Sequence, residues 1–146
     1  MTQMPHSPEA ETAILSAMMQ DPIRAIPRAG ESVCVNTFYN PVNALIYGFL
    51  CELHAAGEPV QLPSIIHKAT QAGKLDEIGG VARILEIEND HVSTPSTLDY
   101  YLTIADHKAK LRDGIKVCSE AIASVDGQMQ DVSEWTGKLL ESCGSR

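Results

Sequence analysis

The sequence is poor in aromatic residues and lacks long apolar runs. Phe, Tyr and Trp make up 5% of its 146 residues, so a core must be built mainly from aliphatic side chains. No apolar segment approaches the ~18 residues that a membrane span requires. The first residues lack the basic and apolar regions of a secretion signal. We therefore expect a cytoplasmic protein that does not associate with membranes.

Clustered metal ligands and paired cysteines are also lacking. None of the four cysteines lies close to another in sequence, and the five histidines are scattered along the chain. Zinc requires clustered ligands, and disulfides are rare in a reducing compartment. We expect free thiols, no disulfide, no metal site and no cofactor. The cysteines are Cys34, Cys51, Cys118 and Cys143.

Motifs for nucleotide hydrolysis and nucleophilic catalysis are missing as well. Gly73-Lys74 and Gly137-Lys138 are each followed by leucine, whereas a P-loop needs a Ser or Thr there to hold magnesium. No serine lies in a GxSxG elbow. The chain alone is therefore predicted to have no catalytic residues and not to be an enzyme.

The net charge of the chain limits which kinds of macromolecule it can bind. The net charge is −8, and contacts with nucleic-acid phosphates need clustered Lys and Arg. Strong direct nucleic-acid binding is therefore not expected. The length and the hydrophobic content of 44% fit one soluble globular domain.

Local signals predict an all-α fold. Ser7-Pro8 and Asn40-Pro41 each pair an N-cap residue with a proline at the first helical position, and Glu9 and Glu11 supply favourable first-turn charges. Three further helical segments are expected over about 62–72, 80–88 and, at greater length, after 95. Residues 22–36 are expected to hold at most a short helix, because Pro22, Pro27 and Gly30 interrupt them.

The longest helical pattern opens at Ser96-Thr97-Leu98-Asp99, which resembles a capping box. Asp126-Gly127 is expected to make a turn, after which a last helix starts near Asp131. These two helices should pack as an antiparallel hairpin. We expect a compact multi-helix head over 1–94 and a helical hairpin over 95–146. The apolar seam of the long helix recurs at spacings of three and four: Tyr101, Ile104, Lys108, Leu111, Ile115, Cys118, Ile122 and Val125.

This seam is longer than one short partner helix can cover, which favours self-association. An intramolecular core explains any single position equally well, because seam and core share the same periodicity. The candidate interface residues are Ile104, Leu111, Ile115, Cys118, Ile122, Trp135 and Leu139.

Several motifs, in order along almost the whole chain, resemble the N-terminal domain of DnaB-type replicative DNA helicases. No single one is decisive, but together they are specific. They include Pro5-His6-Ser7, Glu9-Ala10-Glu11, Gly57-Glu58-Pro59-Val60, Gly73 to Ala82, Thr94-Pro95-Ser96 and Leu98-Asp99-Tyr100-Tyr101.

The resemblance implies a non-catalytic domain with a globular head and a helical hairpin. In that family, hairpins pair between neighbours, six copies form a collar, and the collar recruits primase during DNA replication. The resemblance implies the same roles here, with a helicase loader as a further expected partner. The parent protein would be an ATP-dependent DNA helicase. Relatives usually carry an aromatic residue linked to primase docking where this chain has Arg83, so Arg83 is a further candidate interface residue. This chain also has Gln61 where relatives carry a capping Asp.

Two other interpretations remain open. The chain could be a freestanding adaptor or regulator that copies this domain and binds a helicase or its loader. It could also correspond to the related helicase-binding domain at the C-terminus of primase, although the motifs match the helicase side better.

Overall fold

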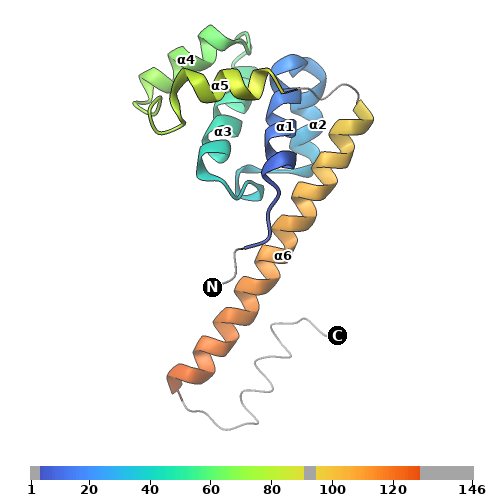
Figure 1. Ribbon diagram of the computed structural model, residues 1–146, viewed down its shortest axis with the longest axis vertical. Coiled ribbons are helices and arrows are strands. Elements are labelled where there is room, and N and C mark those ends of the chain that lie inside the picture. The colour runs from blue at the N-terminus through green and yellow to red at the C-terminus, as the bar shows by residue number, and fades with distance from the viewer. Residues whose placement is uncertain (1–3, 91–94, 129–146) are drawn as a thin grey trace. The chain divides into compact units, whose positions relative to one another are not determined.

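A computed structural model of the chain describes residues 4–90 and 95–128 (Figure 1). Every regular element in these ranges is helical, so the predicted all-α fold class is confirmed. The elements are α1 (Pro8–Gln20), α2 (Pro22–Ser32), the 3₁₀ helix η1 (Val35–Thr37), α3 (Pro41–Ala55), α4 (Leu62–Gln71), α5 (Gly80–Glu88) and α6 (Pro95–Gln128).

The chain divides into two compact units. The head unit, His6–Ala109, contains α1 to α5 and the beginning of α6. The other unit comprises Met1–Pro5 together with the chain from Lys110 onward. The second helix of the expected hairpin, with Trp135 and Leu139, lies outside the described residues.

Helix ends in the head unit follow the local signals. The Ser7 hydroxyl accepts a hydrogen bond from the Ala10 amide (3.2 Å), and the Asn40 side chain accepts one from the Val42 amide (2.8 Å). After α3, Gly57 adopts a φ of 73°, and the amide of Glu58 reaches back to the carbonyl of Leu53 (2.9 Å). This left-handed glycine closes the helix by satisfying a terminal carbonyl.

Helix α2 is longer than expected, because it continues through Pro27 and Gly30 for 11 residues. Proline at position 27 leaves the Ile23 carbonyl without its helical donor, but Ile23 lies at the surface, where water can donate instead. The apolar face of α2 is buried at Ala25, Ile26 and Ala29. Tertiary burial of that face outweighs the weak helix propensity of the segment.

Two expectations about the long helix are wrong. It begins at Pro95, so Ser96 lies within its first turn and is not the N-cap of a capping box. The expected turn at Asp126-Gly127 is part of α6, which continues to Gln128. Extending an existing helix costs less than starting one, so a glycine penalty of about 1 kcal/mol does not end it.

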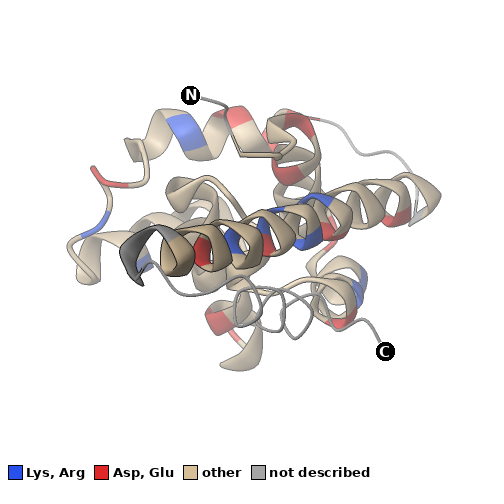
Figure 2. Ribbon diagram, turned by 90° about the horizontal axis from the view of Figure 1, so that it is seen from below, with Lys and Arg blue, Asp and Glu red and all other residues tan. Residues whose placement is uncertain are grey.

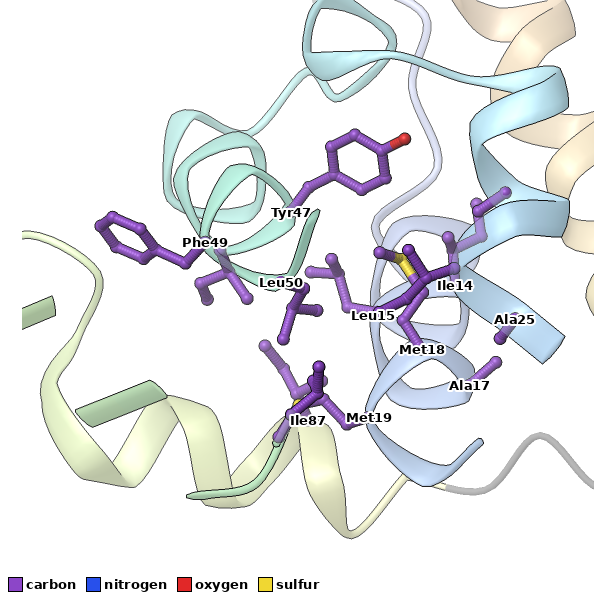
Figure 3. Packing of buried hydrophobic residues seen from close by; sticks show 14 of the residues in the cluster. Ile14, Leu15, Ala17, Met18, Met19, Ala25, Tyr47, Phe49, Leu50 and Ile87 are labelled. Carbon is purple, nitrogen blue, oxygen red and sulfur yellow. The ribbon is translucent and has the colours of Figure 1, made fainter. Parts of the chain in front are cut away.

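The core of the head unit is mainly aliphatic and is centred on α1, which contacts α2, α3 and α5 (Figure 3). Ile14, Leu15 and Met18 are completely buried there. The first turns of α6 join the same cluster through Leu98, Leu102 and Ala105, while Tyr47 and Phe49 of α3 are among its few aromatic residues. The predicted aliphatic core is confirmed.

Candidate protein-interaction surfaces

An exposed apolar row runs along the second half of α6. It consists of Leu111, Ile115, Cys118 and Ile122, which we call the α6 stripe. The spacing of four, three and four residues places these side chains on one face of the helix. Leu111 and Ile115 are each 42% exposed and Ile122 is 57% exposed, and Cys118 is exposed too. Four of the predicted interface residues therefore share one accessible face.

A different face of α6 packs onto the head unit. Leu98, Leu102 and Ala105 are buried in the core cluster, whereas Ile104 is only half-buried. With 3.6 residues per turn, Ile104 points away from the row formed by these three residues. The three-four seam read from the sequence therefore missed the row that attaches α6 to the head.

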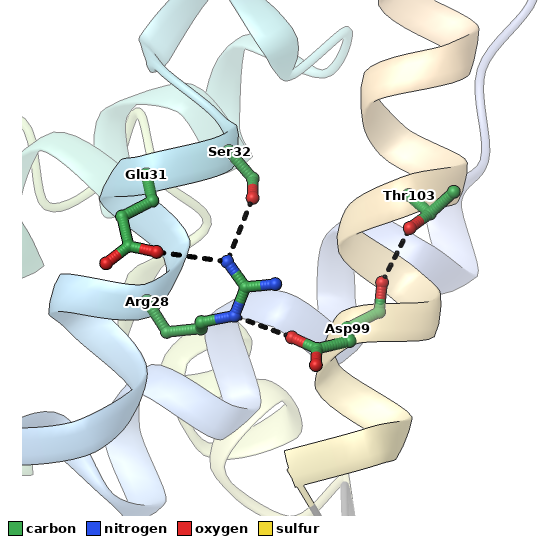
Figure 4. A network of polar contacts seen from close by, with 5 residues as sticks. All are labelled: Arg28, Glu31, Ser32, Asp99 and Thr103. Atoms are coloured by element: carbon green, nitrogen blue, oxygen red, sulfur yellow. Dashed lines mark hydrogen bonds and ion pairs between the residues drawn. The ribbon is translucent and has the colours of Figure 1, made fainter.

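An ion pair also joins α6 to α2 within the head unit. Arg28 Nε donates to Asp99 Oδ1 at 2.7 Å, and the same guanidinium contacts Glu31 and Ser32 (Figure 4). Each partner is about half exposed, so solvent screens the attraction and its contribution to stability is modest. The pair therefore adds only modestly to the packing of Leu98, Leu102 and Ala105 against the core.

Arg83 belongs to a polar network that no sequence signal indicated. Its Nη2 atom donates to Asn43 Oδ1 (2.8 Å) and its Nη1 atom donates to Glu86 (2.8 Å). The side chain is 20% exposed. Gly79 makes this geometry possible, because at φ 91° a Cβ there would lie 2.9 Å from the Arg83 Cβ. Arg83 thus ties α5 to α3.

The network continues to a buried carboxylate on α1. Glu11 accepts hydrogen bonds from the backbone amides of Tyr39 (2.8 Å) and Asn40 (3.3 Å) and from Asn43 Nδ2 (3.0 Å). Asn43 is itself buried and bridges Glu11 to Arg83. A buried charge is tolerated only when it is hydrogen-bonded or paired, and Glu11 has three donors.

The described residues offer little reactive chemistry. Burial raises the pKa of the Tyr47 hydroxyl, which donates to the Val33 carbonyl (3.2 Å), and burial also raises the pKa of the Cys51 thiol. Both groups therefore hold their protons at neutral pH. Within 4–90 and 95–128 no group of His, Cys, Asp and Glu side chains could hold a metal ion, and no helix is long and apolar enough to cross a membrane.

Comparison with known proteins identifies the family. The model of the DnaB-like helicase N-terminal domain family matches residues 3–106. The chain belongs to this family. It is 33% identical over 115 residues to the replicative DNA helicase DnaB of Geobacillus stearothermophilus, and 31% identical over the same length to the replicative DNA helicase DnaC of Bacillus subtilis. Each alignment covers 79% of this chain and 25% of the relative, so the chain spans about a quarter of the length of these helicases.

Solved structures share the DnaB N-terminal fold. The crystal structure of the N-terminal domain of DnaB helicase from Mycobacterium tuberculosis superposes with a TM-score of 0.82 at 23% identity, covering 95% of this chain and 99% of that one. A DnaB-like replicative helicase described with its interactions with primase gives a TM-score of 0.69 at 22% identity over 93% of this chain and 31% of that one. The resemblance inferred from the motifs is confirmed.

Proposed function

We propose that this chain is the non-catalytic N-terminal domain of a replicative DNA helicase that acts in the cytoplasm. In this role it assembles with other copies into dimers or a hexameric collar and docks primase. The parent protein would be an ATP-dependent DNA helicase. The observation that carries the assembly role is the α6 stripe, an exposed apolar row on the second half of α6.

The free energy gained by covering the α6 stripe limits how much of a dimer's stability the stripe can supply. Complete burial of a Leu or Ile side chain is worth ~1.5–3 kcal/mol, and Leu111, Ile115 and Ile122 are each about half exposed. Covering them therefore contributes about 2–4 kcal/mol per protomer, or about 4–8 kcal/mol when two copies bury the same row against each other. Association costs about 4–15 kcal/mol in lost translational and rotational freedom, and ordering of the interface side chains adds to this, so a stable dimer needs further contacts. We propose that Ile104, Trp135 and Leu139 supply them.

The docking role is supported by the family match and by the charge of the head. Residues 6–90, the part of the head unit that precedes α6, contain eleven acidic and five basic side chains, a net charge of −6, whereas α6 (Pro95–Gln128) contains five acidic and four basic ones, a net charge of −1. Figure 2 shows the two signs interspersed along α6. A basic partner surface would complement the head. One fifth of the Arg83 side chain is exposed, and we propose that this exposed part belongs to the surface of the head that faces primase.

Light scattering on a sizing column tests both roles. We expect the chain alone to elute as a dimer or a larger ring, and to elute with primase from the same organism when the two are mixed. A monomer at high concentration would refute the assembly role. A self-associated chain that does not retain primase would refute the docking role alone and would favour binding to a helicase loader.

A further inference from the structure

A groove in the head unit lies between the junction of α1 with α2 and the loop that joins α3 to α4. It has a volume of about 550 Å³, enough for one or two large side chains of a partner. We call it the junction groove. Its lining residues come from two chain segments, Met19–Ile23 and His54–Gln61.

The groove has an apolar floor and an exposed apolar edge. Met19 and Val60 are buried beneath it, and Pro22 and Pro59 line its sides. Ile23 stands at its edge and is 80% exposed, more than any other large apolar side chain for which exposure is described. One exposed isoleucine is ordinary on a protein surface. An isoleucine beside a preformed apolar hollow can be covered by the same partner side chain that fills the hollow.

Both walls of the groove are fixed by hydrogen bonds. On one side, Gln20 Nε2 donates to the Asp90 carbonyl (2.6 Å), and the amide of Asp21 bonds to the Ala17 carbonyl (2.9 Å). On the other side, the Gly57 turn is closed by its amide bond to the His54 carbonyl (3.1 Å). A partner would therefore meet a preorganised surface, which lowers the entropic cost of binding.

The charge at the groove selects the partner. Glu58 lines the groove and is exposed, and in the described part of the chain its carboxylate has no hydrogen bond or ion pair. No Lys or Arg lines the groove, and the surrounding residues 6–90 carry the net charge of −6 derived above. A lysine or arginine next to the inserted apolar side chain would find an unpaired carboxylate.

We propose that the junction groove binds a segment of a partner protein that presents a large aliphatic side chain flanked by Lys or Arg. This inference rests on the docking role proposed above and assigns to it a surface and a partner chemistry. The aliphatic side chain covers Ile23 and contacts Met19 and Val60, while the basic side chain meets Glu58.

Two designed peptides test the proposal on the intact chain. The first is a blocked eight-residue peptide with central leucines flanked by lysines, and the second has glutamates in place of the lysines. Amide chemical shifts of the ¹⁵N-labelled chain are followed during titration. We expect the lysine peptide to give saturable shifts at Met19–Ile23 and His54–Gln61, and the glutamate peptide to bind more weakly.

Two variants sharpen the test. Ile23→Ser should weaken binding of the lysine peptide by about tenfold, whereas Val35→Ser, which changes an exposed apolar residue outside the groove, should not. Glu58→Lys should weaken the lysine peptide by about two- to fivefold and strengthen the glutamate peptide. The control Asp76→Lys makes the same kind of charge change at an exposed site away from the groove.

The outcomes separate this proposal from the docking role. Shifts that map elsewhere, an absence of shifts at the groove, or unchanged binding by Ile23→Ser would each overturn the groove assignment. If primase binds the wild-type chain and the Ile23→Ser variant equally, the docking role stands without the groove. If the peptide binds as expected but primase does not, the groove stands and primase is not its partner. A lower self-associated mass for Ile23→Ser would instead assign the groove to a second copy.

Discussion

Replacing Asn43 with leucine tests whether Arg83 and Glu11 are parts of one internal network. Asn43 is 1% exposed and bridges the two charged side chains, accepting from Arg83 at 2.8 Å and donating to Glu11 at 3.0 Å. Leucine has the same branching and the same number of heavy atoms, so the change removes both hydrogen bonds without opening a cavity. Glu11 then keeps only its two backbone donors.

The magnitude follows from the two lost bonds. A hydrogen bond to a charged group contributes about 1.5–3 kcal/mol. The bond to buried Glu11 should cost this amount, while partly exposed Arg83 can be rehydrated and should add about 0.5–1 kcal/mol. The free energy of unfolding should fall by about 2–4 kcal/mol, a large part of the ~5–15 kcal/mol of a typical domain.

Urea unfolding followed by circular dichroism measures this loss. Asn89→Leu, at an exposed position after α5, is the matched control and should stay within about 0.5 kcal/mol of wild type. Arg83→Met and the double variant with Asn43→Leu should show that the two losses are not additive. A change below about 0.5 kcal/mol for Asn43→Leu would refute the bridging role.

Three further predictions concern the head unit. Gly79→Ala should lower the free energy of unfolding by about 1–3 kcal/mol, because Gly79 has a φ of 91° and the added Cβ would approach the Arg83 Cβ. An unchanged thermal unfolding temperature would contradict this prediction. Arg28→Gln should lower the free energy of unfolding by less than about 1 kcal/mol, because both partners of the ion pair with Asp99 are about half exposed. High salt should remove the difference between this variant and the wild type. A larger loss that does not depend on salt would contradict the prediction. Burial raises the pKa of Tyr47 above its ordinary 10.0, so the folded chain holds the hydroxyl proton more tightly than the unfolded chain does. The stability that this difference contributes is complete below about pH 10 and is lost as the pH rises further. Tyr47→Phe should therefore flatten the alkaline part of the stability profile, and an unchanged profile would contradict the raised pKa of Tyr47.

Local sequence signals predicted the helices whose ends depend on neighbouring residues. The caps at Ser7 and Asn40 and the left-handed Gly57 act within a few residues, so they can be read directly. The same signals failed in α2 and at both ends of α6. In α2 and at the C-terminal end of α6, burial of Ala25 and Ala29 and the extension of an existing helix outweigh the local preferences of Pro27 and Gly127.

The candidate site was predictable only where it follows helical periodicity. The face shared by Leu111 and Ile115 comes directly from their spacing. The role of Glu11 could not be read in the same way, because its donors at Tyr39 and Asn43 lie 28 and 32 residues away in sequence. Its position in the first turn of α1 suggested only a favourable helix charge. Contacts across such separations depend on the packing of α1, α3 and α5.

Sedimentation equilibrium of the Ile115→Asp variant tests the central claim most directly. Aspartate at this position would place an unpaired charge on the α6 stripe, so self-association should weaken by at least about tenfold while the helical circular dichroism is retained. Val117→Asp provides the control, because Val117 is 38% exposed on a different face of α6 and should leave the mass unchanged. If Ile115→Asp folds and associates as the wild type does, the α6 stripe is not the assembly surface.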